Sequence, residues 1–465
     1  MLVRDAMAGS WSIVRAGLAS RTRRPRPRIR PAFRLETLEG RALLSVAPPA
    51  PPTIFVVDQP GDAGSGSGQS GDIRYALKQA DQQSGDSVIV FAPNLFGQTI
   101  DLKSGPLLIH KLSGNLTILG PGVRNLTISG GGQSGVFQVA PISNATIAGL
   151  TITGGFDPQG AGIENFGQLN LVDLTITGND ATEMGGGGVN NTLYGQLTID
   201  QSTISGNLSN LGNGGGIANS GILTINASTI SGNTVSLASG GGIANTGMMT
   251  IGESTIADNQ SLLRFAGGIY NDSTLTLADD TISANTSRNS GGGLTNVAPL
   301  GRVSMNNTIV DGNLAQTDAS TNDILDSRDP VGVLLTGSHD LVGAGNLGLL
   351  ASTLVNPNPM LGSLADNGGP TQTMALEPGS PALNVGDPTL LPAGIIFDQR
   401  GMPYRRVVDG QLDIGSYQVQ SVRYGRSILA KDHPTTLPVL PPVIGLTVSP
   451  ELTPHNTRGS RPVGG

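Results

Sequence analysis

The sequence predicts an all-β chain whose body is a right-handed, single-stranded parallel β-helix. Three observations lead to this fold class. The 465 residues include 68 Gly but only 13% charged and 3% aromatic residues, the middle of the chain repeats about every 26 residues, and apolar residues alternate with polar ones inside each repeat. Gly-rich chains without a collagen period are often disordered. Here, however, hydrophobic residues reach 37% in a regular pattern, which indicates a solenoid with many turns.

The repeat is clearest in two successive segments, GGGIANSGILTINASTISGN from Gly214 and GGGIANTGMMTIGESTIADN from Gly240. An Asn closes six such segments, at steps of 26 or 28 residues: Asn179, Asn207, Asn233, Asn259, Asn285 and Asn313. An apolar residue opens six segments in the same register: Ile163, Val189, Ile217, Ile243, Ile269 and Leu294. Six segments in register predict one coil each.

Within a coil the apolar residues follow the period of two that is typical of strands. Leu223 and Ile225 should face one side of a strand and Thr224 the other. We expect three short strands in each coil, separated by Gly-rich turns, with about four inward aliphatic side chains such as Ile217 and Ile230. A single coil buries too little apolar surface to offset the entropy cost of ordering its backbone, so the coils must stack.

A row of Asn lies two residues after the opening apolar position: Asn165, Asn191, Asn219, Asn245, Asn271 and Asn296. Such a row is either a series of ligand-binding amides or an internal ladder in which each amide bonds the next coil. We favour the ladder, because binding sites rarely recur in every coil.

We divide the chain into five regions. They are a basic, then Pro-rich, disordered targeting or linker segment (1–52), an N-terminal cap with the first strands (53–110), the β-helix repeats (111–345), a closing region (346–420) and a disordered Pro-rich tail (421–465). In the cap, the spacing of Ile73, Ala76, Leu77 and Ala80 predicts a short helix. Ser70 or Asp72 can cap its start and Gly85 can end it.

The distribution of charge and the rare residue types exclude several functions. Residues 1–45 carry a formal charge of +7, while the remainder carries −14. An acidic body disfavours nucleic acid and anionic membranes as partners. There is no Cys and there are four His, so we expect no disulfide, no metal site and no cofactor. No apolar run reaches the length of about 18 residues that a membrane-spanning helix needs.

Several segments resemble known bacterial surface proteins. The GG-I-x-N and S-T-I-S-x-N phrases resemble the right-handed β-helices of the pectate-lyase-like superfamily, and more closely the polymorphic outer-membrane-protein type. The segment Asp366–Asp387, with Phe397–Arg406 and Asp413–Gln418, is similar to the choice-of-anchor Q domain, although Asn384 stands where that pattern usually has Asp. Arg34–Ser45 resembles the LEPR-XLL motif. These resemblances imply a secreted or cell-surface protein. No recognisable anchor follows residue 420, which leaves anchoring and soluble secretion both open.

An enzyme of this superfamily needs an outward-facing group of catalytic side chains. A lyase would need carboxylates for Ca²⁺ and an Arg or Lys base, whereas a hydrolase would need two facing carboxylates. The repeats offer Arg264, Arg288 and Arg302, with Asp258, Asp272, Asp279 and Asp280 nearby. Arg264 and Arg288 occupy equivalent turns of neighbouring coils and form the best basic pair, although we favour two solvated turn residues. Asp280 aligns with Ser228 and Ser254, so one member of the Asp279–Asp280 pair should face solvent.

Sugar-binding platforms favour aromatic side chains, and those of the body are scattered: Phe156, Phe166, Tyr194, Phe265 and Tyr270. A denser charged group lies near the C-terminus: Asp398, Arg400, Arg405, Arg406 and Asp413. We expect it to form ion pairs inside the closing region, although a site is the alternative.

The sequence therefore favours a non-catalytic secreted or cell-surface β-helix with an adhesive or envelope-structural role. Its expected partner is cell-envelope or extracellular polysaccharide, and no catalytic residue is assigned. The alternative is a polysaccharide lyase or glycoside hydrolase acting on an outer face of the β-helix. A Ca²⁺-binding solenoid is weaker, because the repeats lack Gly-rich nonapeptides with a recurring Asp.

Overall fold

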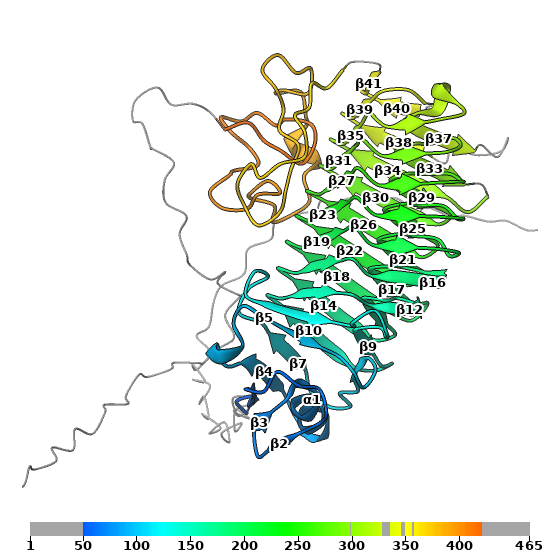
Figure 1. Cartoon of the computed structure of the whole chain (residues 1–465). Helices are drawn as coiled ribbons and strands as arrows, with labels where there is room; N and C mark the ends of the chain where they lie inside the picture. The colour runs from blue at the N-terminus through cyan, green and yellow to red at the C-terminus, as the bar shows by residue number, and fades with distance from the viewer. Residues whose placement is uncertain (1–49, 298, 328–334, 346–348, 356–357, 421–465) are drawn as a thin grey trace, which may run out of the picture. The chain divides into compact units, whose positions relative to one another are not determined.

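The computed structural model describes residues 50–297, 299–327, 335–345, 349–355 and 358–420. The LEPR-XLL-like motif, the basic segment up to residue 49 and the tail 421–465 lie outside the described residues. The described chain is a parallel β-helix flanked near its C-terminal end by a closing region (Figure 1). The predicted parallel β-helix is therefore confirmed.

Each regular coil passes through four sheets, here named A to D. One coil runs through β14 in sheet A, β15 in sheet B, β16 in sheet D and β17 in sheet C, and then returns to sheet A as β18. Strands of successive coils pair in parallel, for example Leu169 with Leu197 and Leu171 with Ile199. The expectation of three strands in each coil was wrong, because it missed sheet D. Most strands of sheet D have two residues, which is too short to show an alternating pattern.

The bounds of the elements follow sheet by sheet. Sheet A contains β2 (Gly66–Ser67), β3 (Ser70–Gly71), β1 (Thr53–Val57), β4 (Ser87–Phe91), β7 (Leu116–Leu119), β10 (Asn144–Ala148), β14 (Gln168–Val172), β18 (Gln196–Asp200), β22 (Ile222–Asn226), β26 (Met248–Gly252), β30 (Thr274–Ala278), β34 (Arg302–Asn306), β38 (Leu335–Ser338) and β40 (Leu349–Ala351). Sheet B contains β5 (Gln98–Asp101), β8 (Leu126–Ser129), β11 (Thr151–Thr153), β15 (Thr175–Thr177), β19 (Thr203–Ser205), β23 (Thr229–Ser231), β27 (Thr255–Ala257), β31 (Thr281–Ser283), β35 (Ile309–Val310), β39 (Leu341–Val342) and β41 (Leu354–Val355).

The two smaller sheets complete the coils. Sheet C contains β6 (Leu107–Ile109), β9 (Phe137–Val139), β13 (Ile163–Asn165), β17 (Val189–Asn191), β21 (Ile217–Asn219), β25 (Ile243–Asn245), β29 (Ile269–Asn271), β33 (Leu294–Val297) and β37 (Ile324–Ser327). Sheet D contains β12 (Phe156–Gln159), β16 (Asp180–Gly185), β20 (Leu208–Ser209), β24 (Thr234–Val235), β28 (Gln260–Ser261), β32 (Thr286–Ser287) and β36 (Leu314–Ala315). The helical elements are α1 (Ile73–Gln82), η1 (Pro93–Leu95), η2 (Ala319–Thr321) and η3 (Pro388–Leu390).

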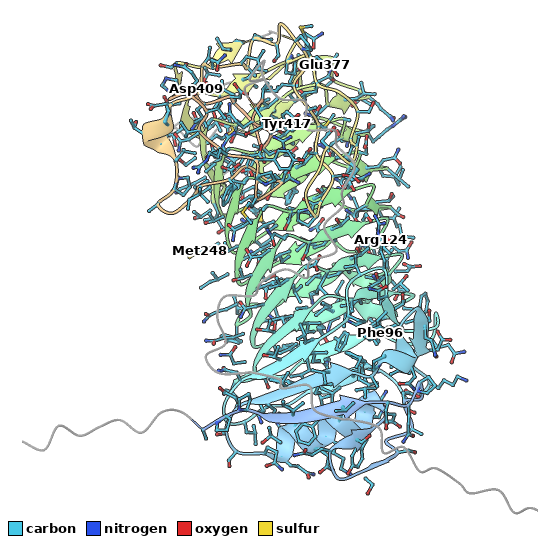
Figure 2. The ribbon with its side chains drawn as sticks, turned by 90° about the vertical axis from the view of Figure 1, so that its left-hand side faces the viewer. Phe96, Arg124, Met248, Glu377, Asp409 and Tyr417 are labelled. Atoms are coloured by element: carbon cyan, nitrogen blue, oxygen red, sulfur yellow. The ribbon has the colours of Figure 1, made fainter. Side chains whose placement is uncertain are left out.

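The inward aliphatic side chains form one continuous core along the rod. The predicted inward residues Ile217, Leu223, Ile225 and Ile230 are all buried in it. The residues between them point outward, and Met248 projects from the outer face of sheet A (Figure 2).

Two Asn ladders run inside the rod. In the predicted ladder, each Nδ2 donates to the Oδ1 of the next coil, as from Asn219 to Asn245 at 2.7 Å. The closing Asn residues form a second ladder that the sequence analysis used only for alignment, as from Asn233 to Asn259 at 2.9 Å. Both ladders end on an Asp, because Asn296 donates to Asp326 and Asn313 donates to Asp323.

A third ladder joins backbone N–H groups to side chains just after the strands of sheet A. Its side-chain acceptors, in order, are Ser202, Ser228, Ser254, Asp280, Thr308 and Asp340. This ladder also ends on an Asp, the carboxylate of which accepts from Thr308 N at 3.0 Å.

The helix α1 covers the N-terminal end of the core, as predicted. Asp72 caps its start by accepting from Tyr75 N at 2.8 Å. Lys111 caps its end, where the buried Nζ donates to Ala80 O at 2.6 Å and to Gln83 O at 2.9 Å. In the described part of the chain, no helix is long and apolar enough to cross a membrane.

The predicted closing region began at residue 346, but β40 and β41 still belong to sheets A and B. The name closing region is therefore kept for residues 358–420, which lie alongside the β-helix and cover part of sheet B (Figure 1). Thr229 Oγ1 donates to Gln372 O at 2.6 Å, and Thr255 Oγ1 donates to Gln399 Oε1 at 2.6 Å. On the next coil, Thr281 Oγ1 accepts from Ser416 N at 3.0 Å. The region thus docks on a column of Thr hydroxyl groups in three successive coils.

Candidate functional site

The predicted basic pair, Arg264 and Arg288, lies on an exposed turn of two neighbouring coils. Asn289 N donates to Arg264 O at 3.0 Å, so the two turns are in contact. Arg288 Nη1 donates to Gln316 Oε1 at 3.2 Å. Within the described ranges, neither guanidinium group forms an ion pair with a carboxylate. The pair therefore lacks the acidic partners that a lyase site would require.

The remaining repeat candidates lie on other coils or turns, and two of them are neighbours, because Arg302 N donates to Ser273 O, next to Asp272, at 2.7 Å. Arg302 is exposed on β34, Asp258 is exposed in a turn, and Asp272 is half-buried. Phe265 and Tyr270 lie on one coil, just before and within β29, whereas Phe156 and Tyr194 are exposed on earlier coils. Phe265 directly follows Arg264, but among the described residues no carboxylate forms an ion pair with the Arg264–Arg288 pair.

Asp279 and Asp280 are both fully buried, so the expectation that one of them faces solvent was wrong. Asp280 belongs to the third ladder, where its Oδ1 accepts from Ser254 N at 2.9 Å and its Oδ2 accepts from Ala278 N at 3.0 Å. Asp279 precedes it at a φ of 64°, which turns its side chain away from the core and towards the closing region. Neither carboxylate is available to a substrate.

Arg406 of the closing region joins Asp279 to the preceding coil. Its Nη2 lies 2.7 Å from Asp279 Oδ1, and its Nε lies 3.0 Å from Glu253 Oε1. The guanidinium group is fully buried, and Nη2 also donates to Asp413 O at 3.2 Å. Burial raises the pKa of Glu253 well above its usual value, although the charge of Arg406 opposes the rise. The cluster is a buried link between the two parts of the molecule.

The ion pairs expected inside the closing region are therefore only partly internal. Arg400 pairs with Asp398 at 2.6 Å and lies between the rings of Tyr404 and Tyr417, at 3.9 and 3.8 Å from their centres. Arg405 is exposed. Asp413 accepts from two backbone N–H groups, and Arg406 bridges to the β-helix instead. The group holds the fold together and leaves no open site.

A hollow of about 570 Å³ opens where the last coils meet the closing region. Its lining residues are Ser283, Asp311, Gly312, Asn313, Asn322, Asp323, Gly343, Ala344, Asn358, Pro359, Leu361 and Met374. The hollow holds two carboxylates from separate turns of the chain. Asp311 follows β35, and Asp323 precedes β37. We call them the carboxylate pair.

The two carboxylates border the same small space. A Cβ added to Gly343 would lie 2.2 Å from Asp311 Oδ1 and 2.3 Å from Asp323 Oδ2, so both oxygen atoms lie close to Gly343 and leave no room there even for a methyl group. Asp323 is held firmly, because its Oδ1 accepts from Asn313 N and Nδ2 at 2.9 Å and its Oδ2 accepts from Ala344 N at 2.6 Å. Asp311 is half-buried, and its Oδ1 accepts from Gly312 N at 2.7 Å.

The environments of the two carboxyl groups differ. Burial raises the pKa of Asp311 to about 6, and the neighbouring charge of Asp323 adds to the rise. Burial also raises the pKa of Asp323, but the hydrogen bonds from Ala344 and Asn313 oppose that rise by stabilising its charge. Two carboxyl groups with separated roles are what acid–base chemistry on a glycosidic bond requires. Among the described residues, no group of three or more His, Cys, Asp and Glu could hold a metal ion.

A second hollow, of about 620 Å³, lies beside α1. Leu77, Leu107, Leu108 and Leu112 make it largely apolar. It contains one carboxylate, Asp81, whose pKa is raised by burial. It is larger than the hollow beside the closing region but lacks a second acidic group, so we place the candidate site at the carboxylate pair.

Comparison with known proteins finds similarity among solved structures. No protein-family model matches the chain, and no curated protein matches it. Among solved structures, the pectate lyase Pel9A is similar at a TM-score of 0.45 and 12% identity, over 79% of this chain and 97% of that one. The PL6 family alginate lyase AlyGC is similar at a TM-score of 0.25 and 12% identity, over 69% of this chain and 55% of that one. Similarity at this level transfers neither a site nor an activity. The choice-of-anchor Q and LEPR-XLL resemblances stay predictions.

Sequence reasoning missed the carboxylate pair. Asp311 follows β35 in the position that Ser283 and Ser231 occupy on earlier coils, so a substitution in the repeat was its signal. Asp323 is the next acceptor in the second Asn ladder, but it lies only 10 residues after Asn313, whereas the other acceptors follow at the spacing of a full coil. That break in the period concealed the alignment.

Proposed function

We propose that this chain is a glycoside hydrolase that works on polysaccharide outside the cell or at its surface. The observation that carries the proposal is the carboxylate pair, because Asp311 and Asp323 lie together beside Gly343 in the lining of an open hollow. This proposal develops the alternative hypothesis from the sequence, an enzyme that acts on an outer face of the β-helix. It assigns the catalytic role to Asp311 and Asp323, which the sequence did not indicate.

The two carboxyl groups would divide the chemistry. Asp311, with a pKa of about 6, is suited to hold a proton near neutral pH and to deliver it to the leaving oxygen of the glycosidic bond. Asp323 accepts from three N–H donors, which favour its charged form although burial raises its pKa. It would act at the anomeric carbon of the same bond, either directly or through a water molecule.

The lining of the hollow favours hydrolysis over elimination. A polysaccharide lyase needs a basic side chain to remove the proton next to a carboxyl group, and the described lining contains no Arg, Lys or His. The predicted basic pair, Arg264 and Arg288, is exposed in a different turn and has no carboxylate ion-pair partner within the described ranges.

A non-catalytic adhesive or structural role is the second candidate. It is favoured by the structural use of most buried charges, since Asp280, Asp340 and Asp326 end or continue ladders and Arg406 ties the closing region to the coils. In that reading, Asp323 would only terminate an Asn ladder.

The test is an activity screen of the full chain on neutral and acidic polysaccharides. Reducing ends and the ultraviolet absorbance of unsaturated products would be followed together. We expect reducing ends without ultraviolet absorbance, abolished by Asp311→Asn and by Asp323→Asn. Asp258→Asn, at an exposed turn, is the matched control and should keep full activity. Unsaturated products would indicate a lyase instead, and no product from any polymer would leave the adhesive role as the better account.

A further inference from the structure

We infer that the hollow selects an uncharged glycan and rejects acidic polysaccharides such as polyuronates. This inference rests on the proposed function, because it concerns the substrate class of the same site. The observation that carries it is the charge of the lining: two carboxylates, with no positive side chain among the described residues that line the hollow.

A uronate unit in this hollow would bring a third carboxylate beside Asp311 and Asp323. The two resident charges already repel each other, since the charge of Asp323 hinders the ionisation of Asp311. The carboxylate of the ligand would lose part of its hydration without forming an ion pair, and this desolvation costs binding free energy. The buried Arg406 offers no help, because it is already paired with Glu253 and Asp279. Like-charge repulsion of this kind gives specificity by exclusion.

The remaining lining suits the two faces of a neutral sugar. Asn322 and Asn358 each use Oδ1 to accept a backbone N–H, from Ala315 at 2.9 Å and from Met360 at 2.8 Å. Their Nδ2 groups are then the side-chain donors suited to sugar hydroxyl groups. Pro359, Leu361 and Met374 add apolar surface, which packs well against the C–H face of a sugar ring. Apolar walls with a few polar groups are typical of small-molecule sites.

The experiment compares binding and hydrolysis of size-matched neutral and uronate oligosaccharides by the full chain. Binding would be measured by calorimetry at about pH 8, where Asp311 is ionised and cannot supply the proton that hydrolysis requires. We expect the neutral oligosaccharides to bind at least about tenfold more tightly. Added salt should narrow the difference by screening the repulsion.

A charge-introducing variant gives a second readout. Asn358→Lys places a cation at the edge of the hollow and should strengthen uronate binding without a matching gain for the neutral ligand. Ser352→Lys, at an exposed position that does not line the hollow, is the control and should change neither. Equal or tighter binding of the uronate by the unmodified chain would overturn the inference. So would an Asn358→Lys variant with the same preference as the control.

The outcomes separate this inference from the proposed function. Hydrolysis that prefers uronate polymers would overturn the charge selection while leaving the hydrolase intact. Binding of neutral oligosaccharides without any hydrolysis would support the selection and refute the enzyme. No binding of either oligosaccharide would overturn both.

Discussion

Replacing Arg406 with Met would leave two buried carboxylates, those of Glu253 and Asp279, without their counter-ion. Arg406 lies 2.7 Å from Asp279 and 3.0 Å from Glu253, and all three side chains are almost fully buried. Met has a similar length and adds no charge, so the change removes the ionic and hydrogen-bonding contacts with little loss of packing. The closing region should lose its main electrostatic link to the coils.

The magnitude follows from the cost of unpaired buried charge. Removing one partner of a buried ion pair typically costs about 3–5 kcal/mol. The loss should depend on pH. Arg406 holds down the pKa of Glu253, which burial raises, so without Arg406 that pKa rises further. A folded state that keeps a proton which the unfolded chain releases becomes less stable as pH rises. The gap between the variant and the unmodified chain should therefore widen from mildly acidic to mildly alkaline pH.

The assay must report on the closing region, because solenoids need not unfold in a single step. Limited proteolysis and hydrogen exchange of residues 358–420 in the full chain would show release of this region, and denaturant unfolding would give the free energy. Arg405→Met, at the exposed neighbouring position, is the control and should change stability by no more than about 0.5 kcal/mol. Combining Arg406→Met with Glu253→Gln and Asp279→Asn should recover part of the loss.

The reasoning would be refuted if Arg406→Met and Arg405→Met had the same effect on proteolysis and unfolding. It would also fail if the triple variant were no better than Arg406→Met, because the cost would then come from packing and not from unpaired charge.

Three further predictions concern the ladders and the cap. Asn259→Leu removes a side-chain amide that makes four buried hydrogen bonds. Each buried partner left without a hydrogen bond lowers the stability by about 1–3 kcal/mol. The denaturant midpoint should therefore fall far more than in the control Asn226→Leu, at the half-buried edge of sheet A. Burial raises the pKa of Asp340 to about 8, so the free energy of unfolding of the unmodified chain should fall from about pH 4 to 8. Asp340→Asn should reduce this fall by about 1.4 kcal/mol per pH unit. The same pH dependence in both proteins would contradict the raised pKa. Lys111→Met removes the C-terminal cap of α1 and should speed hydrogen exchange at the end of that helix, with Lys78→Met as the exposed control.

The features that the sequence predicted well are periodic or local. The first Asn ladder follows from a side chain repeated at the same place in every coil, and α1 follows from Asp72 and the helical spacing after it. Period and position suffice for such features, because parallel stacking converts a sequence repeat directly into contact between neighbouring coils.

The features that it missed depend on contacts between distant residues. Asp279 and Arg406 are 127 residues apart, and nothing in the local pattern around Asp279 shows that a later segment covers it. The carboxylate pair was hidden for the same reason, because Gly343 and the closing region form its surroundings. The part that repeats could be predicted, whereas the part that folds back along the coils could not.

The Asp residues that end the three ladders also limit where the ladders can be extended, although strands of sheets A and B continue beyond them. In each Asn ladder the Nδ2 group donates to the Oδ1 atom of the following coil. Every Asn therefore accepts from the coil before it and donates to the coil after it. Asp323 and Asp326 accept in this way but carry no amide N–H that would then need a partner of its own. Duplicating an interior coil, from Gly214 to Ser239, should therefore lengthen the rod. The same 26 residues inserted after Asp326 would place Asn Oδ1 atoms beside carboxylates that have no N–H group to donate. In evolutionary terms, such a protein grows from its middle.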